Sequence, residues 1–62
     1  MKISFYNENE ECIGEMNNNL NRIPIPRLGE IVHLPMCVGK VIEVCYLFNN
    51  DKHEVLVTLK KI

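Results

Sequence analysis

Hydrophobic and polar residues alternate along most of the chain with a period of two, which is typical of β-strands. The first alternating run covers residues 1–6, where Ile3 and Phe5 share one side, and a second run covers residues 11–16. The polar stretch 7–10 between them contains two asparagines and favours a turn. The two runs therefore predict an N-terminal β-hairpin.

Three further runs alternate in the same way, at residues 31–34, 39–48 and 53–62. Pro35 ends the first of them, because proline has no N–H to donate to a sheet. The polar stretch 49–52 joins the other two into a second hairpin. No segment keeps a helical period of about 3.6 residues beyond one turn, so the pattern predicts an all-β fold of five strands.

Residues 17–29 connect the N-terminal hairpin to the third predicted strand. Within this segment, the sequence IPIP at 23–26 pushes the residue before each proline towards an extended backbone. We expect a stiff surface arm whose isoleucines either fold back on the core or face a partner. A single 3₁₀ turn at 18–22 is the only helical element expected.

The strand predicted at 39–48 is apolar on both sides, which is unusual in a small domain. If the strands close into a barrel, we expect its interior to be filled by Val32, Leu34, Ile42, Val44, Val55, Val57 and Leu59. The residues of opposite phase then form an outer apolar surface, made of Ile31, Val41, Cys45, Leu47 and Leu56. Either the N-terminal hairpin or the arm covers this surface, or it is an interface.

A chain of 62 residues predicts one domain, residues 1–62, with marginal stability. Small domains often add disulfides, a metal or a partner chain. The three cysteines are odd in number and no apolar leader precedes them, which favours buried, reduced thiols in the cytoplasm. The ligand types lack the short paired spacings of zinc sites, so we expect no metal and no cofactor.

The sequence offers little for catalysis. The hydroxyls of Ser4 and Thr58 have no histidine and acid near them in sequence, and neither lies in a Gly-x-Ser-x-Gly motif. The three glycines lie too far apart for a phosphate-binding loop. A filled core leaves no room in one subunit for a pocket of about 300 Å³. We therefore expect a protein that is not an enzyme.

The net charge of −1 excludes a strongly basic nucleic-acid binder, and no apolar run reaches the roughly 18 residues of a transmembrane helix. The acidic cluster Glu8, Glu10, Glu11 and Glu15 is either a solvated hairpin or a patch that steers a basic partner. Among the aromatic residues, we expect Phe5 and at least one of Tyr46 and Phe48 in the core. Tyr6 has the phase of an outward-facing residue.

The run IPRLGEIVHLP, followed by GKVIEVCYLFNNDKHEVLVTLKKI, resembles small SH3-like β-barrel proteins of the phage and bacterial type. The matching residues are Pro26, Gly29, Glu30, Val32, Leu34, Pro35, Gly39, Val41, Val44, Val55, Val57 and Leu59. The resemblance covers about the last three fifths of the chain. It implies a five-stranded barrel that serves as a peptide-binding, nucleic-acid-binding or assembly module. If the protein is phage-encoded, it implies a host-directed inhibitor in the host cytoplasm.

Our first hypothesis is a non-enzymatic protein-binding module, an adaptor or inhibitor that occupies a partner surface or forms a homodimer. Its anchors are Ile31, Val41, Leu47 and Leu56, with Cys45 beside them. The second hypothesis is a nucleic-acid- or ribosome-associated module that uses Tyr6, Arg22, Arg27, Lys60 and Lys61. The third is sequestration of a small ligand at an oligomer interface.

Overall fold

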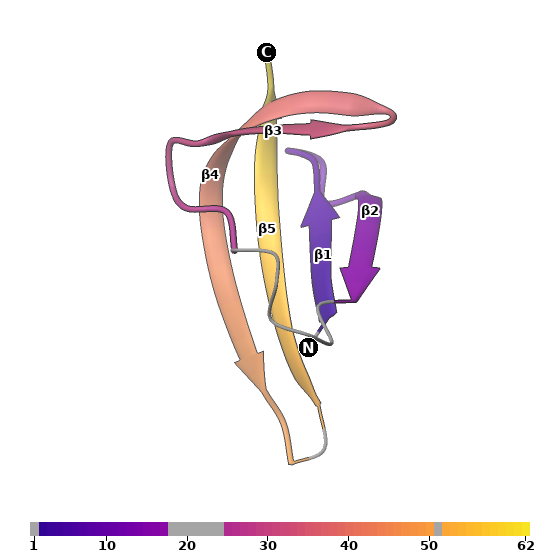
Figure 1. The fold of residues 1–62 in the computed structure, drawn as a ribbon, viewed down its shortest axis with the longest axis vertical. Coiled ribbons are helices and arrows are strands. Elements are labelled where there is room, and N and C mark those ends of the chain that lie inside the picture. Colours follow the sequence, from indigo (N-terminus) through magenta and orange to yellow (C-terminus); the bar gives the residue numbers. More distant parts are fainter. Residues whose placement is uncertain (1, 18–24, 51) are drawn as a thin grey trace.

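The computed structural model describes residues 2–17, 25–50 and 52–62 (Figure 1). Its five strands are β1 (Lys2–Tyr6), β2 (Cys12–Asn17), β3 (Ile31–Leu34), β4 (Cys37–Phe48) and β5 (His53–Lys61). The described residues contain no helix, so the predicted all-β class and both hairpins are confirmed. The 3₁₀ turn predicted at 18–22 lies outside the described residues.

All five strands belong to one sheet with the order β2-β1-β5-β4-β3. β1 runs parallel to β5, and the other neighbours are antiparallel. The sheet curls until its two edge strands approach each other: the Cβ position of Gly14 on β2 lies 3.5 Å from Cδ1 of Leu34 on β3. The result is a nearly closed barrel, which is compatible with the SH3-like fold.

The turn between β1 and β2 is organised by the Asn7 side chain. Its Oδ1 accepts hydrogen bonds from the backbone N–H groups of Asn9 (2.9 Å) and Glu11 (3.0 Å). A side chain that bonds the backbone two residues ahead replaces a backbone turn, as expected for asparagine. The turn predicted from the polar stretch 7–10 is therefore stabilised by the side chain of Asn7.

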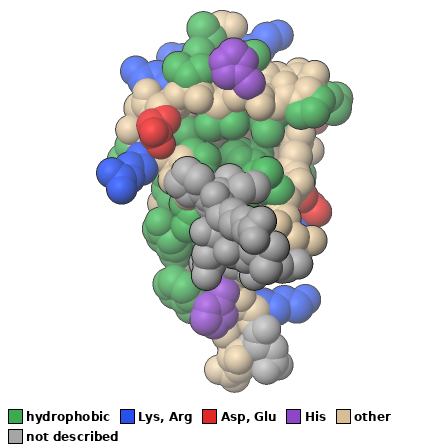
Figure 2. All heavy atoms as spheres, in the orientation of Figure 1, with side chains coloured by type: hydrophobic (Ala, Val, Ile, Leu, Met, Phe, Trp, Pro, Cys, Tyr) green, Lys and Arg blue, Asp and Glu red, His purple; other side chains and the backbone are tan. Residues whose placement is uncertain are grey.

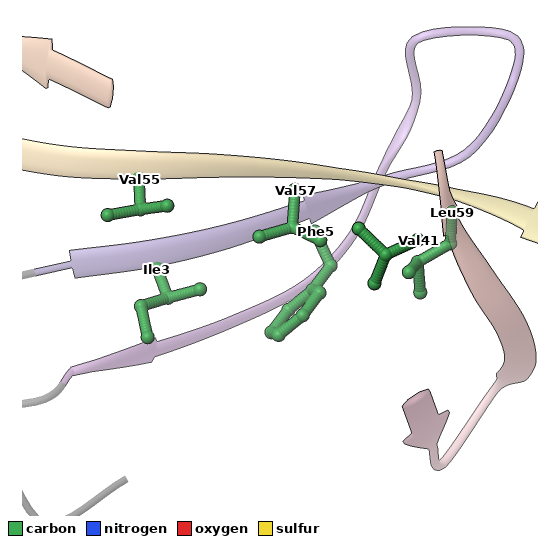
Figure 3. Packing of buried hydrophobic residues seen from close by; sticks show 6 residues of the cluster. All are labelled: Ile3, Phe5, Val41, Val55, Val57 and Leu59. Carbon is green, nitrogen blue, oxygen red and sulfur yellow. The ribbon is translucent and has the colours of Figure 1, made fainter. Parts of the chain in front are cut away.

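The core lies between β1, β4 and β5 (Figure 3). Its six buried side chains are Ile3, Phe5, Val41, Val55, Val57 and Leu59. Half-buried side chains from β2, β3, β4 and the arm pack around them, including Ile25. The described part of the arm therefore folds back on the core.

At the start of β4, the prediction that Ile42 faces the interior and Val41 the outer surface was wrong. Val41 pairs with Leu59, but the next register pair is Glu43 with Thr58, so Ile42 is an extra residue in a β-bulge. Val41 is only 1% exposed and belongs to the core, whereas Ile42 is 44% exposed. The correction has a simple physical reason: a bulge reverses the alternation, and side-chain period alone does not show it.

The expectation that Tyr46 or Phe48 lies in the core was also wrong. The two rings are 51% and 68% exposed. They stack on each other with centroids 6.1 Å apart, and Phe48 meets the His53 ring edge-on at 5.4 Å. Phe48 lies beyond the start of β1, whose pairing with β5 begins at Lys2 and Glu54. Tyr46 is level with Ile3 of β1, but no described strand pairs with β4 on the side away from β5 at this position.

Candidate protein-binding surface

The sheet has an outer face, which we define as the face opposite the core. Strand register places side chains of β1, β5 and β4 side by side across it, because residues that pair directly point to the same face. Two such rows are Ser4, Leu56 and Cys45, and Tyr6, Thr58 and Glu43. The outer face is therefore apolar in its middle and polar at its margins.

A depression of about 240 Å³, here called the outer depression, lies over these rows. Half-buried Leu56 and Thr58 of β5 lie between Tyr6 of β1 and Cys45 of β4. Two carboxylates complete its lining, Glu43 of β4 and Glu10 of the β1–β2 turn. The depression thus combines apolar contact area with negative charge. Glu43 and Thr58 were not predicted as site residues, although both have the phase of the outer face, because phase alone does not show that a depression forms beside them.

Glu10 reaches this position through an uncommon backbone conformation. Its φ of 63° lies in the left-handed region, which residues other than glycine rarely adopt. Its N–H donates to the Asn7 carbonyl over 3.1 Å, so the turn holds this conformation in place. Backbone strain of this kind costs on the order of 1–3 kcal/mol and occurs often at functional sites.

Replacing Glu10 with glycine is expected to raise the free energy of unfolding by up to about 1 kcal/mol, since glycine adopts a positive φ without a steric cost. Urea denaturation followed by circular dichroism measures the change. The matched variant Glu10→Ala removes the same carboxylate but keeps the strain, so it should show no gain. A Glu10→Gly protein that is no more stable than Glu10→Ala would refute this assignment of strain.

The structure brings together three of the five predicted interface residues. Cys45, Leu47 and Leu56 share the outer face, and Leu47 is 41% exposed beside Glu54. Val41 is not an anchor, because it is buried in the core. Ile31 is 49% exposed but lies opposite Lys40, and it lines a separate groove beside the arm.

Within the described residues, neither the N-terminal hairpin nor the arm lies over Cys45 and Leu47. The N-terminal hairpin joins the sheet edge to edge, with β1 beside β5, and so does not lie on top of it. The described part of the arm packs on the core side, where Ile25, Val44 and Tyr46 help to line an open groove of about 550 Å³. Cys45 and Leu47 remain exposed as a result.

The residues proposed for nucleic-acid contact do not form one surface. Tyr6 lines the outer depression, and Lys60 lies on the outer face opposite Lys40. Lys61, as the next residue of the strand, points to the other face. Arg27 lies in the arm on the core side, and Arg22 is outside the described residues.

The cysteines differ from the buried thiols that were expected. Cys12 and Cys45 are exposed and Cys37 is half-buried. In the part of the chain that the structure describes, no group of three histidine, cysteine or acidic side chains is placed to hold a metal ion. None of the described segments is a helix able to cross a membrane.

The end of the outer face near the N-terminus is polar. Ser4 is 1% exposed, and its hydroxyl donates to Oε1 of Glu54 over 2.8 Å. The Lys2 ammonium lies 3.3 Å from Oε1 of Glu15, and this hydrogen bond, with the attraction of the Glu15 charge, raises the pKa of Lys2. Any stability from the pair is present at neutral pH and is lost as the pH rises through that raised pKa. These groups bound the apolar surface on one side.

No protein-family model, curated protein sequence or solved structure matches this chain. The fold and the outer face together define a small β-barrel that leaves an apolar, acid-rimmed surface open to solvent.

Proposed function

We propose that the protein is a non-enzymatic binding module that acts by occupying the surface of a protein partner. The observation that carries the proposal is the adjacency of Cys45, Leu47 and Leu56 on a face where Cys45 and Leu47 remain exposed. An adaptor and an inhibitor both work in this way. The resemblance to short phage and bacterial barrels favours a cytoplasmic inhibitor of a host protein.

The chemistry of the surface indicates what kind of partner it accepts. Fully burying a leucine contributes about 1.5–3 kcal/mol, and Leu47 and Leu56 are already partly buried. Their contact alone thus falls short of the roughly 8 kcal/mol of a micromolar complex. Glu10 and Glu43 can supply electrostatic complementarity, which speeds association and orients the partner. A matching partner presents an apolar side chain flanked by lysine or arginine.

The double substitution Leu47→Asp and Leu56→Asp tests this proposal, because it places charge in the apolar contact. We expect wild-type protein, used as bait in its source cells, to retain partner proteins. The double variant should retain at least tenfold less of these proteins. Met36→Asp is the matched control, since Met36 is 84% exposed in the β3–β4 turn, away from the outer depression. A folded double variant, as judged by circular dichroism, that retains the same proteins as wild type would contradict the proposal.

A further inference from the structure

β4 is paired on both sides only in its first part. β3 pairs with residues Cys37 to Lys40, and the backbone of Val41 bonds to Gly29 and Glu30. From 43 to 48, β4 pairs with β5 on one side. On the other side, no described residue forms a backbone ladder with the stretch from Ile42 to Phe48. Figure 1 shows this stretch as the margin of the sheet below the point where the arm crosses.

The direction of the backbone groups along this free edge follows from two sets of hydrogen bonds. Val41 N–H donates to the Glu30 carbonyl and Val41 C=O accepts from Gly29 N–H, both over 2.9 Å. The backbone N–H and C=O groups of Val41 therefore point away from β5. The Val41–Leu59 pair is therefore not hydrogen-bonded, and the next pair, Glu43–Thr58, is.

The far end of the hairpin agrees with this assignment. Asn49 N–H donates to the Lys52 carbonyl over 2.9 Å. The odd-numbered residues of β4 beyond the bulge therefore direct their backbone N–H and C=O groups to β5. Because hydrogen-bonded and non-hydrogen-bonded pairs alternate in an antiparallel ladder, Val44, Tyr46 and Phe48 direct their N–H and C=O groups to the free edge.

Apart from the bulge at Ile42, with which it begins, this edge lacks the features by which proteins usually prevent edge pairing. It is long, and its sequence IEVCYLF contains no lysine or proline and one charge, that of Glu43. Among the described residues it holds four of the nine exposed large hydrophobic side chains, namely Ile42, Tyr46, Leu47 and Phe48. In the orientation of Figure 1, hydrophobic side chains follow the β4 side of the molecule (Figure 2). The formal edge strands β2 and β3 are shorter, with six and four residues.

The geometry points to a second copy of this chain as the occupant, bound by antiparallel pairing of the two β4 edges about a two-fold axis at Cys45. In this register Val44 of each copy forms a hydrogen-bonded pair with Tyr46 of the other. These are aromatic and β-branched partners, which favour each other across strands. Glu43 lies opposite Leu47, so no like charges face each other.

The free stretch itself selects this register. Only an axis at Cys45 pairs every residue of 42–48 with another residue of the same stretch. An axis at Val44 would place Phe48 against Lys40, whose edge β3 already occupies. An axis at Tyr46 would pair Val44 with Phe48 and extend into the 49–52 turn, leaving Ile42 and Glu43 without strand partners. The symmetric register at Cys45 is therefore the only one that uses the edge completely.

The proposed pairing also places two thiols together. The backbone N–H and C=O groups of Cys45 point to β5. Cys45 therefore faces its symmetry mate in a non-hydrogen-bonded pair, where Cα atoms are about 4.5 Å apart. That separation lies within the roughly 4.4–6.8 Å of disulfides. Under added diamide, each Cys45 thiol gives up one proton and one electron, the two electrons reduce one diamide molecule, and an S–S bond joins the chains. The disulfide is a probe of the register and no part of the proposed function.

Tyr46→Pro and Tyr46→Ala form a matched pair of test variants. Both remove the half-exposed ring, but only proline removes the N–H that points to the second copy, and the ladder with β5 does not use that N–H. We expect sedimentation equilibrium to give twice the 7.2 kDa chain mass for wild type and Tyr46→Ala, and the single-chain mass for Tyr46→Pro. Circular dichroism verifies that each variant is folded.

In a Cys12→Ser, Cys37→Ser background, diamide should convert the protein to covalent dimer, and adding Tyr46→Pro should slow this conversion at least tenfold. A monomer at all concentrations would overturn the proposal, as would open-ended aggregates or a dimer that Tyr46→Pro leaves intact. A dimer that Leu56→Asp dissolves and Tyr46→Pro does not would show face-to-face association, which also overturns it. Glu43 and Cys45 belong to both the edge and the outer depression, but Tyr46→Pro changes only the edge and Leu56→Asp changes only the depression, so either proposal can fail while the other stands.

Discussion

Replacing Phe5 with alanine is expected to leave the protein largely unfolded at 25 °C. Phe5 is 2% exposed at the centre of the core, beside Val57. Truncating a buried phenylalanine costs about 3–5 kcal/mol, because the transfer free energy of the ring is lost and a cavity is left. The free energy of unfolding of a domain of this size rarely exceeds about 3–5 kcal/mol. Far-ultraviolet circular dichroism and the dispersion of amide proton signals measure the loss of fold.

The matched control is Phe48→Ala. Phe48 is 68% exposed and contacts Tyr46 and His53 at the open end of the hairpin. Its truncation should change the free energy of unfolding by no more than about 0.5 kcal/mol, as for other exposed positions. A folded Phe5→Ala protein with near wild-type stability would show that the core is not where the structure places it.

Gly39→Ala is expected to destabilise the fold by about 1–3 kcal/mol, the usual cost of overpacking a core. Gly39 is buried, and the Cβ position on it lies 2.8 Å from Cβ of Leu59 and 3.1 Å from the carbonyl oxygen of Lys60. Both atoms belong to β5 close to its backbone, so they cannot move without disturbing the β4–β5 ladder. The φ of Gly39 is not positive, so the cost comes from the contact alone.

Gly14→Ala is the control for this substitution. The Cβ position on Gly14 meets its nearest atoms at ordinary contact distance, 3.5 Å from Leu34 and 3.9 Å from Phe5. Adding a methyl group there should be neutral or stabilise by up to about 1 kcal/mol, because alanine has less conformational freedom to lose. Urea denaturation that ranks Gly39→Ala at or above Gly14→Ala would contradict the packing at β4 and β5.

The two proposed interfaces have a joint consequence. A two-fold axis that pairs β4 with its copy in antiparallel fashion is perpendicular to the sheet, so both outer depressions lie on the same side of the dimer. Two identical sites on one side can bind a partner that is itself dimeric, and the second contact is then intramolecular. The edge pairing would thus increase the avidity of a partner surface of modest affinity.

Much of the fold was predictable because strand alternation and turn chemistry are local. The runs around Ile3 and Phe5, the Asn7 turn, and the β4–β5 hairpin are all visible in neighbouring residues. The outer placement of Cys45, Leu47 and Leu56 was predictable for the same reason, since Cys45 and Leu47 lie beyond the bulge of β4 and Leu56 lies on β5.

Other features depend on which strands become neighbours. The bulge at Ile42 moves Val41 into the core, and it arises from the fit of β4 against both β5 and the Gly29–Glu30 backbone. The exposure of Phe48 follows from where β1 begins relative to β5, and the exposure of Tyr46 follows from its place on a part of β4 that only β5 pairs with among the described strands. The hydropathy pattern predicts neither the bulge nor the exposed rings, because apolar side chains have the same pattern whether or not another strand covers them.

By itself, the sequence determined five strands, two hairpins and an excess of apolar side chains for so small a barrel. Only the tertiary structure decided that β1 pairs in parallel with β5, that Val41 turns inward, and that no described strand pairs with the outer edge of β4 from 42 to 48. The physical reason is the range of the interactions involved. Alternation and turns act over a few neighbouring residues, whereas strand order, bulges and free edges are settled by contacts between residues far apart in the chain.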